Sequence, residues 1–209
     1  MGKKDGWVVP VTPEIRRNIE NTAHAAYMNG SNLRQDAVTL FESCRYPRAV
    51  ALAILAEEEF SKALILKASA EQGRWDSNLY KALHKHPEKQ GIVEGIMAHA
   101  IWFIGHAKFI ERLNRVSLVQ VRPSMLPGDK EMEKILSNVK SYFKKPIKDK
   151  LKQNSIYVSI DKSGKTTSKP DQIGKEEAET YLNKSYKMNV ITEVAFGDYS
   201  NAKDLEDIL

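Results

Sequence analysis

Two adjacent carboxylates and a lysine form the best-specified polar group of the sequence: Glu58, Glu59 and Lys62. Glu58 lies four positions before Lys62, and Glu59 lies three positions before it. Because side chains three or four positions apart on a helix are neighbours, either carboxylate can pair with the ammonium group. Two interpretations stay open. The group is a partly buried structural ion pair that fixes the helix register, or it lines a groove of the bundle and orients His86 or Lys89 of the next helical hairpin.

Histidines and lysines gather around Pro87, which is predicted to begin a helix. Because free backbone amides at the start of a helix attract anions, a phosphate group could bind there with help from a histidine or a lysine. The alternative is that His86 only caps the helix. The residues at this helix start are His84, Lys85, His86 and Lys89. The predicted polar groove consists of Glu58, Glu59, Lys62, His86 and Lys89.

The segment from 140 to 152 is rich in lysine and contains Asp149 as its acid, with two aromatic residues interleaved. Its lysines are Lys140, Lys144, Lys145, Lys148, Lys150 and Lys152. Such a pattern is typical either of a surface that contacts phosphates or of an ordinary solvated helix face. The first interpretation predicts nucleic-acid contacts at Lys140, Lys144, Lys145 and Lys148.

No group of cysteines and histidines has the spacing of a structural zinc site, so no metal is predicted. His99 and His106 lie seven positions apart and lack the four-residue spacing and acidic partner of a helical zinc site. We expect both to be core histidines. The single cysteine, Cys44, cannot form an intrachain disulfide, which fits a reducing cytoplasm.

Composition and hydropathy indicate an ordinary globular protein. Apolar residues make up 42% and charged residues 28% of the chain, and the net charge of +5 is modest for 209 residues. The longest apolar-rich stretch, 49–56, falls far short of the roughly 20 residues that cross a bilayer. The N-terminus lacks the apolar stretch of a signal peptide. We therefore predict a cytoplasmic protein without a membrane segment.

The first helices are predicted from their capping and stop signals. The triplet TPE at 12–14 provides a side-chain cap, a proline for the first helical position and an acid at the positive end of the helix dipole. We expect a helix over 13–28, stopped by Asn29 and Gly30, and a second helix over 32–46. A third helix over 47–73, apolar on most faces, is expected to be the central helix of the bundle.

The rest of the chain is predicted to hold further helices and one strand. After a short loop at 74–76, Ser77 is expected to cap a brief helix, followed by helices over 88–116 and from Asp129 to Pro146. Alternating apolar residues within 155–165 predict a short strand, with a hairpin as an alternative. A last helix is expected over 175–188.

The whole chain, 1–209, is interpreted as a single domain. We expect its helical core over about 13–145 and a C-terminal strand and helix over about 155–190.

Three stretches resemble the AbiV abortive-infection proteins. The first, at 34–66, is RQDAVTLFESCRYPRAVALAILAEEEFSKALIL and holds the family's Glu-Glu-x-x-Lys form. The second, at 83–90, is LHKHPEKQ, with a His-x-x-Lys arrangement. The third, at 151–164, is LKQNSIYVSIDKSG, and with the later Pro170 it is similar to the family's C-terminal Leu-Tyr-Val strand and its proline. The resemblance covers the chain from 32 to about 186.

This resemblance implies a mainly α fold, a HEPN-like helical bundle with a short C-terminal β-strand or hairpin. It also implies a bacterial antiphage role in which the metabolism of the infected cell is shut down. Many HEPN proteins are homodimers, and many are ribonucleases that need no metal or cofactor. We therefore expect a homodimer without a cofactor, a phage-encoded protein as its trigger, and RNA or the translation machinery as its target.

The HEPN ribonuclease signature is an arginine, a polar residue and a histidine a few positions further along. The arginine would stabilise the negatively charged phosphorane, and the histidine would move a proton at the 2′-hydroxyl or the leaving oxygen. Arg17, Asn18 and His24 match this order, and a step of seven residues returns to nearly the same helix face. No arginine precedes the other histidines at the right distance.

Two functions stay open ahead of a third, an antitoxin or adaptor that acts with a nucleotidyltransferase on a separate chain. One is an abortive-infection effector that shuts down host gene expression or translation through RNA, with Arg17 and His24 as catalytic residues. The other is a non-catalytic module that binds RNA or protein.

Overall fold

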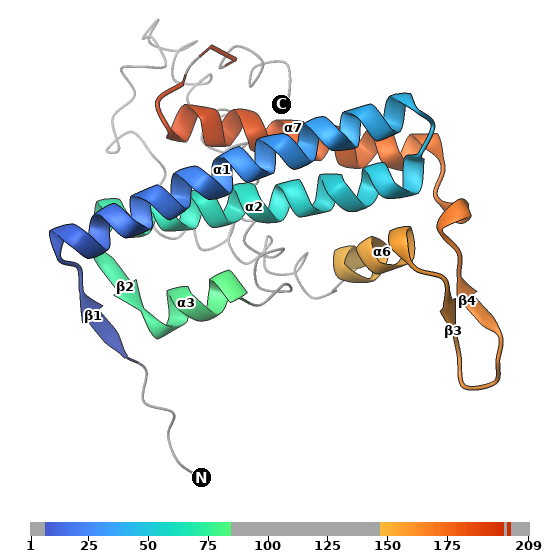
Figure 1. Cartoon of the computed structure of the whole chain (residues 1–209), viewed down its shortest axis with the longest axis horizontal. Helices are drawn as coiled ribbons and strands as arrows, with labels where there is room; N and C mark the ends of the chain where they lie inside the picture. The colour runs from blue at the N-terminus through green and yellow to red at the C-terminus, as the bar shows by residue number, and fades with distance from the viewer. Residues whose placement is uncertain (1–6, 85–146, 199, 202–209) are drawn as a thin grey trace, which may run out of the picture.

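The computed structural model of the chain describes residues 7–84, 147–198 and 200–201. Three long helices run side by side along the molecule (Figure 1): α1 (Pro13–Glu42), α2 (Tyr46–Gln72) and α7 (Lys175–Ala195). α1 and α2 form an antiparallel hairpin, and α7 packs against both of them. The mainly helical fold predicted from the sequence is confirmed.

α1 is one continuous helix of 30 residues, so the predicted break at Asn29 and Gly30 is wrong. Gly30 is buried where α1 meets α2, and a Cβ built on it would lie 2.8 Å from two ring carbons of Phe60. A residue without a side chain is therefore needed for the two helices to come this close. The predicted helix start is confirmed, because Thr12 Oγ1 accepts a hydrogen bond from the Ile15 amide at 3.2 Å.

Gly30→Ala is expected to lower the free energy of unfolding by about 1–3 kcal/mol, the cost of overpacking a filled core. The gain in helix propensity, about 1 kcal/mol, matches only the lower end of that range, so a net loss of stability is expected. Thermal denaturation would measure the change. Gly174→Ala is the matched control, because a Cβ at Gly174 meets nothing within 4 Å. If Gly30→Ala were as stable as the wild-type protein, or more stable, the result would contradict the close approach of α1 and α2 at Gly30.

α2 lies at the centre of the bundle, as predicted, with Val50, Ile54 and Phe60 fully buried. It contacts α1, α7 and α6 (Ile147–Ile156). The helix ends at Gly73, which adopts the left-handed conformation at φ 63° and donates its amide to the carbonyl of Ala70. The predicted helix end is confirmed.

A short ribbon and a helix lie at one end of the hairpin of α1 and α2 (Figure 1). β1 (Val8–Pro10) pairs antiparallel with β2 (Arg74–Asp76), where the sequence predicted a loop, and α3 (Ser77–His84) follows directly. Asp76 Oδ1 accepts a hydrogen bond from the Leu79 amide at 3.0 Å. Asp76 therefore caps α3, and the prediction that Ser77 caps this helix is wrong.

A hairpin projects from the opposite end of the bundle, after α6 (Figure 1). β3 (Ser159–Ile160) pairs antiparallel with β4 (Thr166–Ser168), so the predicted strand is half of a hairpin. Asp161 accepts hydrogen bonds from the Ser163 hydroxyl and from the amides of Ser163 and Lys165. These bonds hold the pKa of Asp161 below its ordinary value, the Ser163 hydroxyl having the largest effect.

The chain returns to the bundle through the short 3-10 helix η3 (Pro170–Gln172) and then forms α7. The last predicted helix is confirmed and extends to Ala195. The helices predicted over 88–116 and from Asp129 lie outside the described residues, as do His99 and His106. None of the described helices is long and apolar enough to cross a bilayer.

Candidate functional site

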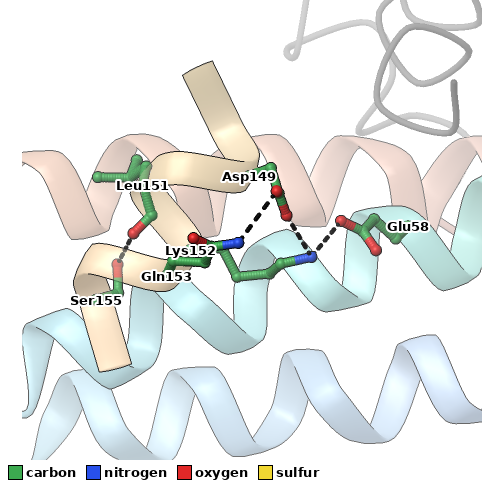
Figure 2. Close-up of polar contacts among 6 residues, drawn as sticks. All are labelled: Glu58, Asp149, Leu151, Lys152, Gln153 and Ser155. Atoms are coloured by element: carbon green, nitrogen blue, oxygen red, sulfur yellow. Dashed lines mark hydrogen bonds and ion pairs between the residues drawn. The ribbon is translucent and has the colours of Figure 1, made fainter. Parts of the chain in front are cut away.

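The two adjacent carboxylates of α2 have different partners. Glu58 is buried and pairs with Lys152 of α6, whose Nζ lies 2.8 Å from Glu58 Oε1 (Figure 2). Glu59 pairs with Lys62 on its own helix. Neighbouring positions on a helix point about 100° apart, so one carboxylate reaches into the bundle while the other stays on a more exposed face. The group predicted as one unit is therefore two separate ion pairs.

The pair between Glu58 and Lys152 joins α2 to α6. Lys152 Nζ also lies 3.5 Å from Asp149 Oδ1, and Asp149 accepts a hydrogen bond from the Gln153 amide group at 3.3 Å (Figure 2). The side chains of Lys152 and Glu58 are only 11% and 4% exposed. Lys152, which the sequence placed in the lysine-rich surface, is thus an internal cation and cannot contact a phosphate in solution.

Lys62 borders a cavity of about 550 Å³, which we call the groove cavity. It lies between α1, α2, β2 and α3, and its polar lining includes Asn18 and Thr22 of α1 and His84 of α3. Leu66, Trp75 and Leu83 supply an apolar wall. The Lys62 side chain is 26% exposed, which leaves its ammonium group partly accessible.

His84 is held in place beside this cavity. Its Nδ1 lies 2.7 Å from the Tyr80 carbonyl oxygen, and its ring stacks on the Tyr80 ring with the centroids 4.0 Å apart. A carbonyl oxygen can only accept a hydrogen bond, so Nδ1 is the donor and Nε2 is the ring nitrogen left for a second partner. The groove cavity therefore combines a lysine, an oriented histidine and an asparagine, a set of groups suited to binding an anion such as a phosphate.

Arg17 and His24 are both exposed on α1. The His24 ring packs edge-on against the rings of Tyr27 and Phe196, each at a centroid distance of 6.4 Å. Neither residue lines the groove cavity, although Asn18, the polar residue of the predicted triplet, does. The described structure brings Asn18, Lys62 and His84 together and places Arg17 and His24 elsewhere on the α1 surface.

Most of the other predicted site residues lie outside the described part of the chain: His86, Lys89, Lys140, Lys144 and Lys145. The backbone of Lys148 belongs to α6, and its side chain is not described. Within the described ranges, no three histidine, cysteine, aspartate or glutamate residues form a group that could hold a metal ion.

A polar cluster between α1 and α7 was not predicted. Asn189 Nδ2 donates to Glu193 Oε1 at 2.6 Å, and Ser31 donates to Asn189 Oδ1 at 3.2 Å. The Arg34 guanidinium lies over the Tyr186 ring at 4.7 Å, and burial lowers the pKa of Arg34. The sequence signal for this cluster is the spacing of Asn189 and Glu193, which lie four positions apart on α7. Many other polar residues of α7 are exposed, so this pair does not stand out in the sequence.

A comparison with protein-family models matched residues 18–189 to the AbiV family of HEPN proteins. The match includes α1 from Asn18, all of α2, α6, the hairpin and most of α7. The chain belongs to the AbiV family. Searches of curated proteins and of solved structures gave no match.

Membership of the AbiV family makes the chain a HEPN module of the abortive-infection type. The family match begins within the first helical turns of α1 and includes the residues of both ion pairs, Glu59 with Lys62 and Glu58 with Lys152. In this AbiV-family chain the form has two physical roles, because Glu58 fastens α6 to the bundle while Glu59 holds Lys62 beside the groove cavity.

Proposed function

We propose that this AbiV-family protein is a cytoplasmic abortive-infection effector that shuts down host gene expression or translation after a phage-encoded protein engages it. The observation that carries the proposal is the family match, which runs through almost every described element. A homodimer is the proposed assembly, in keeping with the HEPN resemblance.

RNA is the proposed target, and the groove cavity supports it. Lys62 and His84 offer a cation and an oriented imidazole beside Asn18, and together these groups suit a nucleic-acid phosphate. Lys140, Lys144, Lys145 and Lys148 remain the proposed nucleic-acid contacts, on the evidence of their spacing in the sequence. Arg17 and His24 are the proposed catalytic residues if the RNA is cleaved.

A non-catalytic module that binds RNA or protein is the second candidate. The position of His24 favours it, because the ring packs against Tyr27 and Phe196 and does not line the groove cavity. A general acid or base must lie within hydrogen-bond reach of the proton that it transfers, and His24 does not line the cavity proposed to bind the phosphate. Binding alone would then block translation.

The deciding experiment is incubation of the purified full chain with total bacterial RNA and with a translating extract, each with and without phage lysate. The wild-type protein is compared with Arg17→Ala/His24→Ala and with Arg16→Ala, a control that removes a neighbouring exposed arginine of α1. Cleavage that disappears only in the double variant establishes a ribonuclease. Arrested translation with intact RNA establishes the binding inhibitor. Full translation and intact RNA in the presence of lysate contradict the proposed function.

A further inference from the structure

A second cavity has a volume of about 530 Å³ and is lined by residues of the α1–α2 turn and residues next to the hairpin of β3 and β4. The hairpin projects from that end of the bundle (Figure 1). We call this second cavity the turn cavity, because the turn between α1 and α2 forms one of its walls. The end of α6 and the segment that leads into η3 form the others. The volume is in the range of small-molecule sites. The turn cavity shares no lining residue with the groove cavity.

Three cationic side chains line the turn cavity: Arg45, Arg48 and Lys169. Asp171 is the acid among its lining residues, so three positive groups face one carboxylate. Within the described ranges, none of the three cations forms an ion pair. Like charges gathered around one concave surface repel each other and create a positive potential, which an anionic ligand would relieve.

The backbone of the turn holds the two arginines in place. Cys44 adopts a left-handed conformation at φ 58°, its amide donates to the Phe41 carbonyl, and the Arg45 amide donates to the Leu40 carbonyl at 2.8 Å. These bonds fix the point where α2 begins, and Arg45 immediately precedes that helix. The arginines are therefore presented from an ordered turn, which lowers the entropy cost of ligand binding.

The turn cavity also has an apolar wall. Tyr46 and Pro47 contribute to it from α2, and Ile156 and Val158 contribute from the chain after α6. Ile156 and Val158 are large apolar residues that are 47% and 68% exposed. Apolar groups beside cations that form no ion pair with another described residue match a ligand that has an anionic end and a planar or apolar body. The guanidinium fork of arginine suits the oxygens of a phosphate in particular.

From these features we infer that the turn cavity binds a phosphate monoester carrying a ring, of the size of a mononucleotide. The phosphate lies against Arg45, Arg48 and Lys169, and the ring lies along Tyr46, Ile156 and Val158. Two sources supply this chemistry, a free nucleotide and the 5′-phosphorylated end of an RNA chain. Binding in the turn cavity does not require that Arg17 and His24 of α1 cleave RNA.

Cys44 provides a direct readout of occupancy. It is the single cysteine of the chain, it is exposed, and it lines the turn cavity. Ribonucleoside 5′-monophosphates are expected to slow the modification of Cys44 by a thiol reagent in the purified full chain, and calorimetry is expected to show binding. The matching nucleosides and inorganic phosphate, which each lack one half of the ligand, are expected to bind more weakly.

The variant Arg45→Gln/Arg48→Gln is expected to weaken binding by roughly a hundredfold, because two charge-assisted hydrogen bonds are lost. Lys169→Gln should weaken it by roughly tenfold. Lys162→Gln removes a lysine from the nearby hairpin that does not line the cavity, and it should leave binding unchanged. Thermal denaturation of each variant separates a binding loss from a folding defect.

The outcomes are distinct. If no nucleoside monophosphate binds or protects Cys44, or if the double arginine variant binds as well as Lys162→Gln, the site is overturned. Equal binding of inorganic phosphate would overturn the role of the apolar wall. An oligoribonucleotide with a 5′-phosphate that protects Cys44, where the same chain with a 5′-hydroxyl does not, supports the site with an RNA end as the source. Protection by mononucleotides alone supports it with a free nucleotide as the source.

Discussion

Lys152→Met is expected to lower the free energy of unfolding by about 3–5 kcal/mol, because it removes the Lys152 ammonium group from beside the buried Glu58 carboxylate. The pair joins α6 to α2 with an Nζ to Oε1 distance of 2.8 Å, and both side chains are almost inaccessible to water. Methionine keeps most of the length and apolar volume of lysine, so the loss reports on charge more than on packing. Chemical denaturation of the purified protein would measure it.

Lys175→Met is the matched control for this change. Lys175 forms an ion pair with Glu179 at 3.6 Å, but both side chains are more than half exposed, and such pairs contribute about 0–1 kcal/mol. The double variant Glu58→Leu/Lys152→Met should recover much of the loss, since it removes both buried charges together. Equal stability of Lys152→Met and Lys175→Met would show that the buried pair has no special role.

Local sequence signals predicted the ends of the helices well. Thr12, Pro13 and Glu14 mark the start of α1, and Gly73 marks the end of α2. These signals act through hydrogen bonds within one turn of the helix, so the residues that make them are close together in the sequence.

Gly30 shows why a break was wrongly predicted in the middle of α1. An asparagine and a glycine in succession are typical of a turn, and the sequence does not reveal that a ring from α2 lies against the glycine. The contact with Phe60 needs the tertiary arrangement of both helices. Gly30 therefore resembles a helix stop in the local sequence, but in the folded bundle it lies inside α1 and contacts Phe60.

The partner of Glu58 was equally hidden. Lys62 lies four positions away and is the expected partner on helix geometry, whereas Lys152 is 94 positions away along the chain. The lysine-rich composition of 140–152 favoured a solvated or phosphate-binding surface. Burial of one of these lysines depends on how α6 docks on α2, and no local pattern encodes that docking.

The groove cavity differs from the predicted polar groove. It contains Lys62, but its other polar lining residues include Asn18 and His84, which were not part of that prediction. The predicted groove of Glu58, Glu59, Lys62, His86 and Lys89 stays a prediction, because His86 and Lys89 lie outside the described residues. Asn18 was selected only as the polar residue between Arg17 and His24. Its place beside Lys62 follows from the packing of α1 against α2, which brings the first turns of α1 to the last turns of α2.

Lys62→Ala is expected to abolish phage protection and to weaken RNA binding about tenfold to a hundredfold, the loss of one hydrogen bond between charged groups. The melting temperature should hardly change. The pair of Lys62 with Glu59 is partly exposed and lies within one helix, where such pairs contribute only about 0.3–0.5 kcal/mol. Plaque counts in cells with matched protein levels, together with RNA titrations of the purified chain, would measure both effects.

Two further variants separate a functional Lys62 from a structural one. Lys67→Ala breaks a similar ion pair on the same helix, with Glu71 at 3.0 Å, but Lys67 does not line the groove cavity. Glu59→Gln keeps the Lys62 ammonium group and removes its carboxylate partner. If Lys62 acts on a phosphate, Lys67→Ala and Glu59→Gln should both retain protection. Loss of soluble protein in Lys62→Ala would instead make the pair of Lys62 and Glu59 a structural element of α2. Equal loss of protection in all three variants would lead to the same conclusion, because a fold defect would explain why a change at Lys67, away from the groove cavity, has the same effect.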